Sequence, residues 1–264
     1  MSKALMTIHG FLTETTDFGR LYDYVGMYDE VKAVEIPGHN GEKPNFKLFN
    51  VKDTFQAVLT VYDDLKSRHD AVDVVGFSMG GALATWLCSV RSVNRAVFVA
   101  PANKYINGQL PVSVCKYKKA VKRKAFRETE GKLRDKRAAA KKALAPYRAN
   151  KKITMKIAKR RTIRYMYPRN FAIFSKIIKR SNVVIETTSP NKTPALILWG
   201  RLDELVPIKS VRYLTKHFTN AQVTVYPDVG HAMLVSVRDF VVIRDAVRFL
   251  TEGEVILDVP EREY

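Results

Sequence analysis

The chain has 264 residues, of which 46% are hydrophobic and 27% are charged, close to the average for globular proteins. This composition excludes a mini-protein and a wholly disordered chain, and 13 glycines with 11 prolines are too few for a collagenous chain. The formal net charge of +19 raises the question of a nucleic-acid or anionic-membrane partner.

The positive charge lies in one segment of the chain. Residues 101–182 contain 26 Lys or Arg and three acidic residues, whereas the rest of the chain contains 19 basic and 23 acidic residues. Such an asymmetry indicates a boundary of structure or function. We therefore expect a core made of residues 1–100 and 191–264, and an inserted basic cap of residues 101–190.

Outside the insert, short apolar segments alternate with segments of helical spacing. The predicted strands are Ala4–Ile8, Val31–Ile36, Ala71–Phe77, Arg95–Ala100, Pro194–Trp199 and Ala221–Tyr226. The predicted helices are Asp17–Met27, Val51–His69, Met79–Ser92, Ile208–Phe218 and Ser236–Leu250. Near-continuous apolar strands are typical of a parallel sheet covered on both faces. The alternation predicts an α/β fold of about six mostly parallel strands, with ligands beyond their carboxyl ends.

The insert interrupts this alternation and has helical character throughout. Three helices are predicted there, at Val112–Ala145, Lys151–Tyr165 and Arg169–Arg180. Their apolar residues recur at roughly helical spacing, so each helix can lay an apolar stripe on the core or over its cleft.

A Gly-x-Ser-x-Gly motif, Gly76-Phe77-Ser78-Met79-Gly80, joins a predicted strand to a predicted helix. In this context the glycines permit a sharp turn that presents a serine hydroxyl at the carboxyl edge of the sheet. The pentapeptide alone is also compatible with a glycine turn that carries an incidental serine. Its strand-turn-helix setting favours Ser78 as a nucleophile.

A serine nucleophile needs a base and an orienting carboxylate, which follow it in the order acid then histidine. His231 lies in the loop after the last predicted strand and is the candidate base. Asp203, in the loop after the preceding strand, is the preferred acid, with Glu204 and Asp228 as alternatives. For the remaining histidines we expect solvent-exposed or hydrogen-bonding roles; they are His9, His39, His69 and His217.

The tetrahedral intermediate of acyl transfer needs two backbone N–H donors. The first candidate is Met79, directly after the nucleophile. The second is Phe11, in the loop after the first predicted strand, where Gly10 permits an unusual backbone conformation. For both residues the side chain is equally compatible with a place in the core or the cleft wall.

These motifs together resemble those of the α/β-hydrolase family, and within it of small bacterial carboxylesterases and monoacylglycerol-lipase-like enzymes. The resemblance rests on His9-Gly10-Phe11, Ile36-Pro37-Gly38-His39, Gly76–Gly81, Gly200–Pro207 and Gly230-His231. It implies ester hydrolysis through an acyl-enzyme, with Ser78, Asp203 and His231 as the triad and Phe11 and Met79 as oxyanion donors. The chain departs from the family in opening at what would be the third strand, and in its larger and more basic insert.

The resemblance and the triad predict a serine carboxylic-ester hydrolase acting on short- to medium-chain acyl esters, monoacylglycerols among them. An acyltransferase or thioesterase with the same triad is an alternative, and so is a non-enzymatic module that binds anionic lipid or nucleic acid. We expect no cofactor and no metal. An apolar acyl pocket under the cap is expected from Phe11 and from the candidate substrate-binding residues Leu12, Tyr165, Met166, Phe171 and Phe174.

Three interpretations of the cationic cap remain open. Its charges either face solvent without a partner, attract an anionic ester or an anionic lipid surface, or bind nucleic acid. The last is the least favoured, because no nucleic-acid recognition motif accompanies the charge. The two cysteines, Cys88 and Cys115, are far apart and are expected to be reduced thiols. With no apolar run long enough for a secretory or membrane segment, a cytoplasmic protein is expected.

Overall fold

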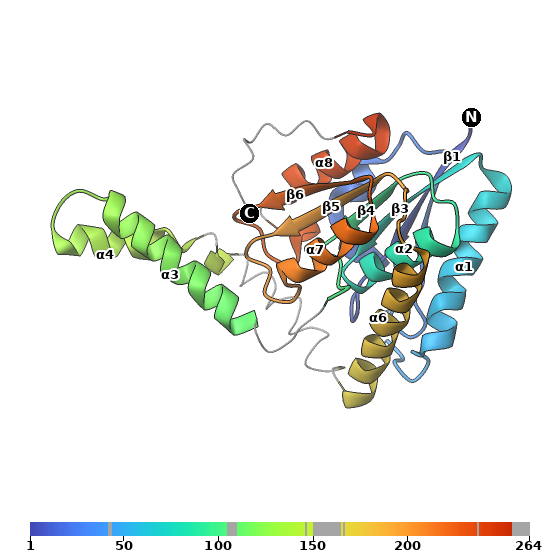
Figure 1. The fold of residues 1–264 in the computed structure, drawn as a ribbon, viewed down its shortest axis with the longest axis horizontal. Helices are drawn as coiled ribbons and strands as arrows, with labels where there is room; N and C mark the ends of the chain where they lie inside the picture. Colours follow the sequence, from blue (N-terminus) through green and yellow to red (C-terminus); the bar gives the residue numbers. More distant parts are fainter. Residues whose placement is uncertain are drawn as a thin grey trace.

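The computed structural model describes residues 1–41, 44–104, 110–145, 147–149, 165, 167–236 and 238–254. Its centre is a six-stranded sheet with the order β2-β1-β3-β4-β5-β6, in which all neighbouring strands are parallel (Figure 1). The predicted α/β class with six parallel strands is confirmed. The strands are β1 (Lys3–Ile8), β2 (Glu30–Val34), β3 (Ala71–Phe77), β4 (Ala96–Val99), β5 (Ala195–Gly200) and β6 (Ala221–Tyr226).

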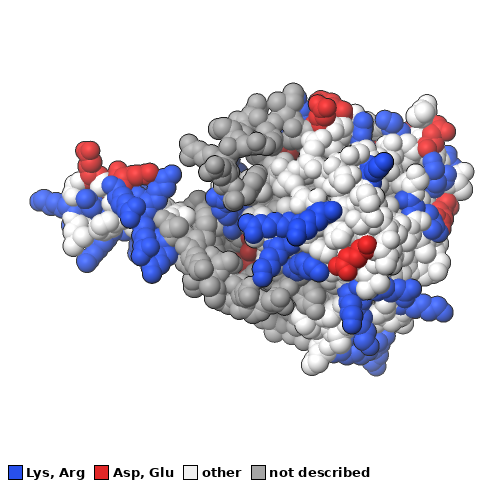
Figure 2. Space-filling model, in the orientation of Figure 1, with Lys and Arg blue, Asp and Glu red and all other residues white. Residues whose placement is uncertain are grey.

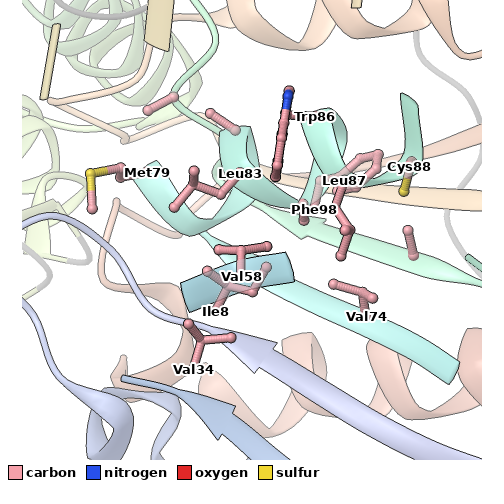
Figure 3. Close-up of a cluster of buried hydrophobic side chains, with 14 of the residues drawn as sticks. Ile8, Val34, Val58, Val74, Met79, Leu83, Trp86, Leu87, Cys88 and Phe98 are labelled. Atoms are coloured by element: carbon pink, nitrogen blue, oxygen red, sulfur yellow. The ribbon is translucent and has the colours of Figure 1, made fainter. Parts of the chain in front are cut away.

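Helices cover both faces of the sheet, and each face has its own hydrophobic cluster. One face packs against α1 (Val51–Arg68), α2 (Met79–Val90), α6 (Pro168–Thr188) and α7 (Ile208–His217). The other packs against η1 (Thr15–Tyr24), η2 (Met233–Val235) and α8 (Asp239–Glu252). Figure 3 shows Ile8, Val34 and Val74 of the sheet together with Val58 of α1 and Leu83 of α2, and all five side chains belong to one buried cluster. Because helices bury the side chains on both faces of the sheet, the strands appear in the sequence as continuous apolar segments.

The helix predicted at Asp17–Met27 is instead a 3₁₀ segment, η1, broken at Gly19. Gly19 has φ 56°, and a Cβ atom there would lie 2.9 Å from the carbonyl oxygen of Leu234 in η2. The chain therefore bends at Gly19 so that η1 and η2 can pack closely. The helix predicted at Ser236–Leu250 corresponds to α8, which begins three residues later, at Asp239; the separate 3₁₀ turn η2 ends at Val235, before the predicted range.

The segment predicted as one helix at Val112–Ala145 forms two, α3 (Leu110–Glu128) and α4 (Leu133–Lys142). The chain reverses at Gly131, whose φ of 113° suits glycine. The two helices pack against each other and extend away from the edge where β5 and β6 end (Figure 1). We call residues 110–142 the basic hairpin. Of the helix predicted at Lys151–Tyr165, all but Tyr165 lies outside the described residues.

Helix α6 is longer than the predicted Arg169–Arg180 and packs along α2. Ile177, Ile178 and Ile185 of α6 are buried in the same cluster as the α2 side chains. The division of the chain into core and cap stays a proposal. Because α6 packs on the core, a cap that is separate from the core would contain only the part of the insert that precedes α6.

The two ends of the insert are tied together by side-chain amides. Asn182 of α6 donates to the carbonyl oxygen of Asn103 at 2.7 Å, and the amide nitrogen of Asn103 lies 3.0 Å from Thr85 Oγ1 of α2. The two asparagines therefore join the ends of the insert to each other and, through Thr85, to α2.

Two further observations concern the described residues only. No helix there is long and apolar enough to cross a membrane. Cys88 is a free, buried thiol, and burial raises its pKa, which keeps it in the unreactive protonated form.

If α6 is a core helix, Ile177→Ala lowers the free energy of unfolding by about 2 to 5 kcal/mol, because it leaves a cavity in the cluster shared with α2. The control is Val183→Ala on the same helix, since Val183 is 53% exposed; we expect it to change stability by less than about 0.5 kcal/mol. Urea denaturation of both variants measures the difference. Equal effects would contradict the placement of α6 in the core.

Candidate active site

The turn between β3 and α2 holds Ser78 in an uncommon backbone conformation, with φ 55° and ψ −114°. A non-glycine residue in such a conformation is strained and persists only where the surroundings fix it. Here the Ser78 N–H donates to the Val99 carbonyl at 2.9 Å, and the Ser78 carbonyl accepts from Ala82 N at 3.2 Å and Ala102 N at 3.0 Å. The hydroxyl is thereby presented at the carboxyl edge of the sheet.

The glycines on either side of Ser78 are required by close backbone contacts. A Cβ atom on Gly80 would lie 1.9 Å from the Ile8 carbonyl oxygen, and one on Gly76 would lie 2.3 Å from the Gly80 carbonyl oxygen. No side chain fits at either position without moving a main chain. The two glycines of the Gly-x-Ser-x-Gly motif are therefore required by the close packing of α2 on β1 and β3.

The structure brings Ser78, His231 and Asp203 together in a continuous line of hydrogen bonds. Ser78 Oγ lies 3.0 Å from His231 Nε2, and His231 Nδ1 lies 2.8 Å from Asp203 Oδ2. The other Asp203 oxygen accepts from the backbone N–H groups of Leu205 and Val206, at 2.7 and 2.8 Å. The Asp203 side chain is fully shielded from solvent and that of His231 is only 9% exposed. This arrangement orients the imidazole, with one nitrogen toward the carboxylate and the other toward the hydroxyl.

The two alternative acids have other partners. Glu204 accepts from the hydroxyl of Tyr147, a residue that follows the basic hairpin. Asp228 accepts from Arg238 Nε at 3.0 Å. Among the three carboxylates considered from sequence, Asp203 is thus the one that contacts His231.

The predicted oxyanion donors lie beside Ser78. A Cβ atom on Gly10 would be 3.1 Å from Ser78 Cβ, so the loop carrying Phe11 N–H approaches the hydroxyl closely. Met79 N–H opens α2, where the helix dipole favours negative charge. Within the part of the chain that the structure describes, neither N–H has a backbone acceptor.

The side chains of His9 and Thr13 hold the loop that carries Phe11 in place, because both contact the carbonyl oxygen of Gly10. Ile36 N–H points at His9 Nε2, so we assign the ring proton to Nδ1, which lies 3.0 Å from the Gly10 oxygen. Thr13 Oγ1 donates to the same oxygen at 2.9 Å. The sequence predicted a hydrogen-bonding role for His9 without indicating that its partner is the oxyanion loop.

An aromatic wall extends from this loop to the insert. The Phe11 ring stacks on Phe174 of α6 at 4.9 Å, and Phe171 lies 5.9 Å from Phe174. Tyr165 packs on Phe46, with ring centroids 5.0 Å apart. Of the other predicted pocket residues, Leu12 is buried in the core cluster, and Met166 lies outside the described residues.

Sequence reasoning missed the contribution of the segment between β2 and α1. Phe46 and Phe49 from this segment complete the wall, with Phe49 5.8 Å from Phe11. Their three-residue spacing was a weak signal because it falls outside any predicted helix or strand. Among the described residues, no group of three or more His, Cys, Asp or Glu side chains gathers into a possible metal site.

Comparisons with known proteins give one family. The family model described as alpha/beta hydrolase fold matches residues 37–236, which include Ser78, Asp203 and His231. A search of curated protein sequences gives no match.

Solved structures resemble the chain over nearly its whole length at low sequence identity. A metagenome-derived lipolytic enzyme shares 15% identity with a TM-score of 0.64, covering 95% of this chain and 94% of that one. A putative lipase from Acinetobacter baumannii shares 17% with a TM-score of 0.60, covering 95% and 84%. The enol-lactonase from Burkholderia xenovorans shares 16% with a TM-score of 0.62, covering 95% and 92%. At these identities, the likeness establishes the fold alone.

The close contact at Gly80 predicts that Gly80→Ala lowers stability by about 1 to 3 kcal/mol or more, because the added methyl group must displace the backbone of β1 or α2. Gly26→Ala is a matched control, since a Cβ atom there meets nothing within 4 Å. Chemical denaturation compares the two variants. A Gly80→Ala protein as stable as wild type would refute the steric requirement.

Proposed function

Since the chain belongs to the alpha/beta hydrolase fold family, we propose that it is a serine carboxylic-ester hydrolase acting through an acyl-enzyme. One observation carries the proposal: Ser78 Oγ, His231 and the buried Asp203 form an unbroken hydrogen-bonded line with distances of 3.0 and 2.8 Å. A serine hydroxyl placed against a histidine that is itself oriented by a carboxylate is the arrangement that activates serine for attack on an acyl group.

In the proposed reaction His231 Nε2 takes the proton of Ser78 Oγ as the oxygen attacks the ester carbonyl carbon. The new C–O bond converts the carbonyl to a tetrahedral oxyanion, which the N–H groups of Phe11 and Met79 stabilise. The protonated His231 then gives its proton to the leaving alkoxide as the old ester bond breaks. His231 then takes a proton from a water molecule, whose oxygen attacks the acyl carbonyl carbon. As the bond between this carbon and Ser78 Oγ breaks, His231 returns the proton to Ser78 Oγ, and the carboxylic acid leaves.

Asp203 stabilises the histidine in both of its charge states. In the resting state its carboxylate accepts from Nδ1–H and so leaves the lone pair of Nε2 directed at Ser78. During the reaction the same carboxylate faces an imidazolium in a site closed to water, where opposite charges attract strongly. The two backbone N–H groups of Leu205 and Val206 hold the carboxylate in this position.

We further propose that the acyl chain lies along the aromatic wall. Phe11 and Phe174 stack next to the oxyanion loop, and Phe171 continues the wall outward to solvent. Such a surface suits short- to medium-chain acyl esters, monoacylglycerols among them. The names of two similar structures, a lipolytic enzyme and a putative lipase, agree with an acyl ester as substrate.

The triad predicts that Ser78→Ala lowers kcat for a p-nitrophenyl acyl ester by at least about 10³-fold and abolishes labelling by a fluorophosphonate probe. Both effects follow from the loss of the oxygen that forms the covalent bond. Retention of hydrolysis and labelling would overturn the proposal. It would favour the non-enzymatic binding module instead.

The acid assignment predicts that Asp203→Asn lowers kcat on the order of 10⁴-fold, because an amide no longer holds the histidine in its active tautomer. The neighbouring carboxylates provide matched controls, since Glu204→Gln and Asp228→Asn remove one charge each from the same two loops. We expect both controls to retain kcat close to wild type. Steady-state hydrolysis of the same ester distinguishes the three positions.

An acyltransferase or thioesterase would use the same triad, and product analysis separates these activities. For an ester hydrolase we expect free carboxylic acid as the main product even when glycerol is present as a competing alcohol. We also expect kcat/KM for an acyl-CoA thioester to be lower than for the matched oxygen ester. Glycerol esters as the main product would indicate acyl transfer, and a preference for the thioester would indicate a thioesterase.

A further inference from the structure

We propose that the protein docks on an anionic phospholipid surface through the basic hairpin and an apolar rim formed by Leu48, Tyr167 and Phe171. The inference names a partner for the site described above. It rests on the proposed function in one respect, because an anionic phospholipid surface supplies acyl esters. Docking itself needs no catalysis.

The first observation is the charge of the basic hairpin. Residues 110–142 contain 13 Lys or Arg and three acidic residues. Figure 2 shows Lys and Arg side chains clustered on the described part of the hairpin, which projects from the core, with acidic side chains along one side of it. The exposed cations are Lys119, Lys122, Arg123, Lys124, Arg127, Lys132, Arg134, Arg137, Lys141 and Lys142.

The acidic residues of the hairpin leave most of this charge uncompensated. Asp135 accepts from the backbone N–H of Lys132 at the start of α4. Glu128 forms a single, loose contact of 3.8 Å with Lys124. Among the hairpin side chains that the structure describes, Leu133, 55% exposed, is the one large exposed hydrophobic residue. This described part of the hairpin is therefore suited to electrostatic attraction.

The second observation is the apolar rim beside the site. Leu48 is 57% exposed, Tyr167 58% and Phe171 37%. Arg169 brings them together, because its guanidinium donates from the start of α6 to the carbonyl oxygens of Phe46 at 2.9 Å and Phe49 at 3.2 Å. Leu48 lies between these two acceptors in sequence. Exposed apolar side chains that gather at one place indicate an interaction surface.

The rim is the open end of the aromatic wall. Phe171 contacts Phe174, which stacks on Phe11 next to Ser78. On the other side of the site, Tyr147 joins the chain after the hairpin to Glu204, the neighbour of Asp203. The basic hairpin and the apolar rim therefore both connect to the carboxyl edge of the sheet. A surface that contacts both would face the entrance to the site.

The combination favours lipid over nucleic acid. A nucleic-acid duplex would neutralise the hairpin through its phosphates but offers no apolar region to Leu48, and only unpaired bases would stack on Tyr167 and Phe171. An anionic bilayer offers negative headgroups to the cations, and its interfacial region suits both the aromatic and the aliphatic side chains of the rim. The aliphatic part of the rim thus favours the bilayer, where the charge alone leaves both partners open.

The test is flotation of the full chain with vesicles of phosphatidylcholine containing about 30% phosphatidylglycerol, compared with pure phosphatidylcholine, at low and high salt. We expect binding to the anionic vesicles, little binding to the neutral ones, and weaker binding as salt rises to about 0.5 M. Equal binding to both vesicle types, or none to either, would overturn the inference.

A triple variant, Lys119→Gln, Lys122→Gln and Lys141→Gln, removes three exposed charges of the hairpin. We expect the partition coefficient for anionic vesicles to fall between about 10-fold and 100-fold. The matched control changes Lys66, Lys192 and Lys216 to Gln. These lysines are also exposed, but each lies shortly before the first residue of a strand. They are therefore at the amino ends of the strands, opposite the carboxyl edge that carries the site. Equal losses in the two triple variants would contradict a docking role of the hairpin.

The rim is tested by Leu48→Ser combined with Tyr167→Ser, with Tyr24→Ser and Met27→Ser as control. The control residues are 48% and 43% exposed. They precede β2 and so lie near the amino ends of the strands, opposite the carboxyl edge that carries the site. We expect only the rim variant to lose vesicle binding. Tighter binding of wild type to a single- or double-stranded oligonucleotide than to anionic vesicles, unaffected by the rim substitutions, would instead assign the hairpin to nucleic acid.

Failure of this inference and failure of the proposed function give different results. Ser78→Ala should bind anionic vesicles as wild type does, and the lysine variants should hydrolyse a soluble p-nitrophenyl ester at the wild-type rate. For the hairpin variant we expect weaker vesicle binding with intact ester hydrolysis, and for its lysine control we expect both to be retained. Wild-type protein that hydrolyses esters but ignores anionic vesicles overturns the docking proposal and leaves the proposed function in place.

Discussion

The contact between the α2 N-terminus and β1 is the constraint on which the site depends. Because residue 80 lies against the Ile8 carbonyl, the chain can turn directly from β3 into α2 only where there is no side chain. The same turn forces Ser78 to φ 55°, and the neighbouring backbone of β4 and the segment after it holds it there. Since β1 pairs with β3, the loop after β1 is brought to the hydroxyl. One close approach of main chains thus sets both the nucleophile and its oxyanion loop.

The sequence predicted those parts of the structure that follow a general rule of parallel sheets. Parallel strands end at a common edge, so Ser78, Asp203 and His231, each in a loop after a strand, were expected to meet, and their side chains do. The choice of Asp203 over Glu204 was less certain from sequence, because adjacent residues share a loop. The structure separates them: Asp203 contacts His231 and accepts from two backbone N–H groups, whereas Glu204 contacts Tyr147.

Other features had no local signal. The break in η1 at Gly19 arises from a contact with Leu234, far along the chain, which helical spacing does not report. Charge gave no indication of how the basic insert packs. The insert's last helix carries Lys and Arg on its outer side, yet its isoleucines belong to the cluster beneath α2. A boundary drawn from charge therefore differs from one drawn from burial.

The amide contacts between Asn103 and Asn182 bear on how such a chain can change over evolution. They close the insert at its base, between the segment after β4 and helix α6, which packs on α2. We therefore expect the sheet to tolerate changes in the length and sequence of the segment between them. Segments of different size and charge can be exchanged above this closure, and the same catalytic geometry can be combined with a different recognition surface.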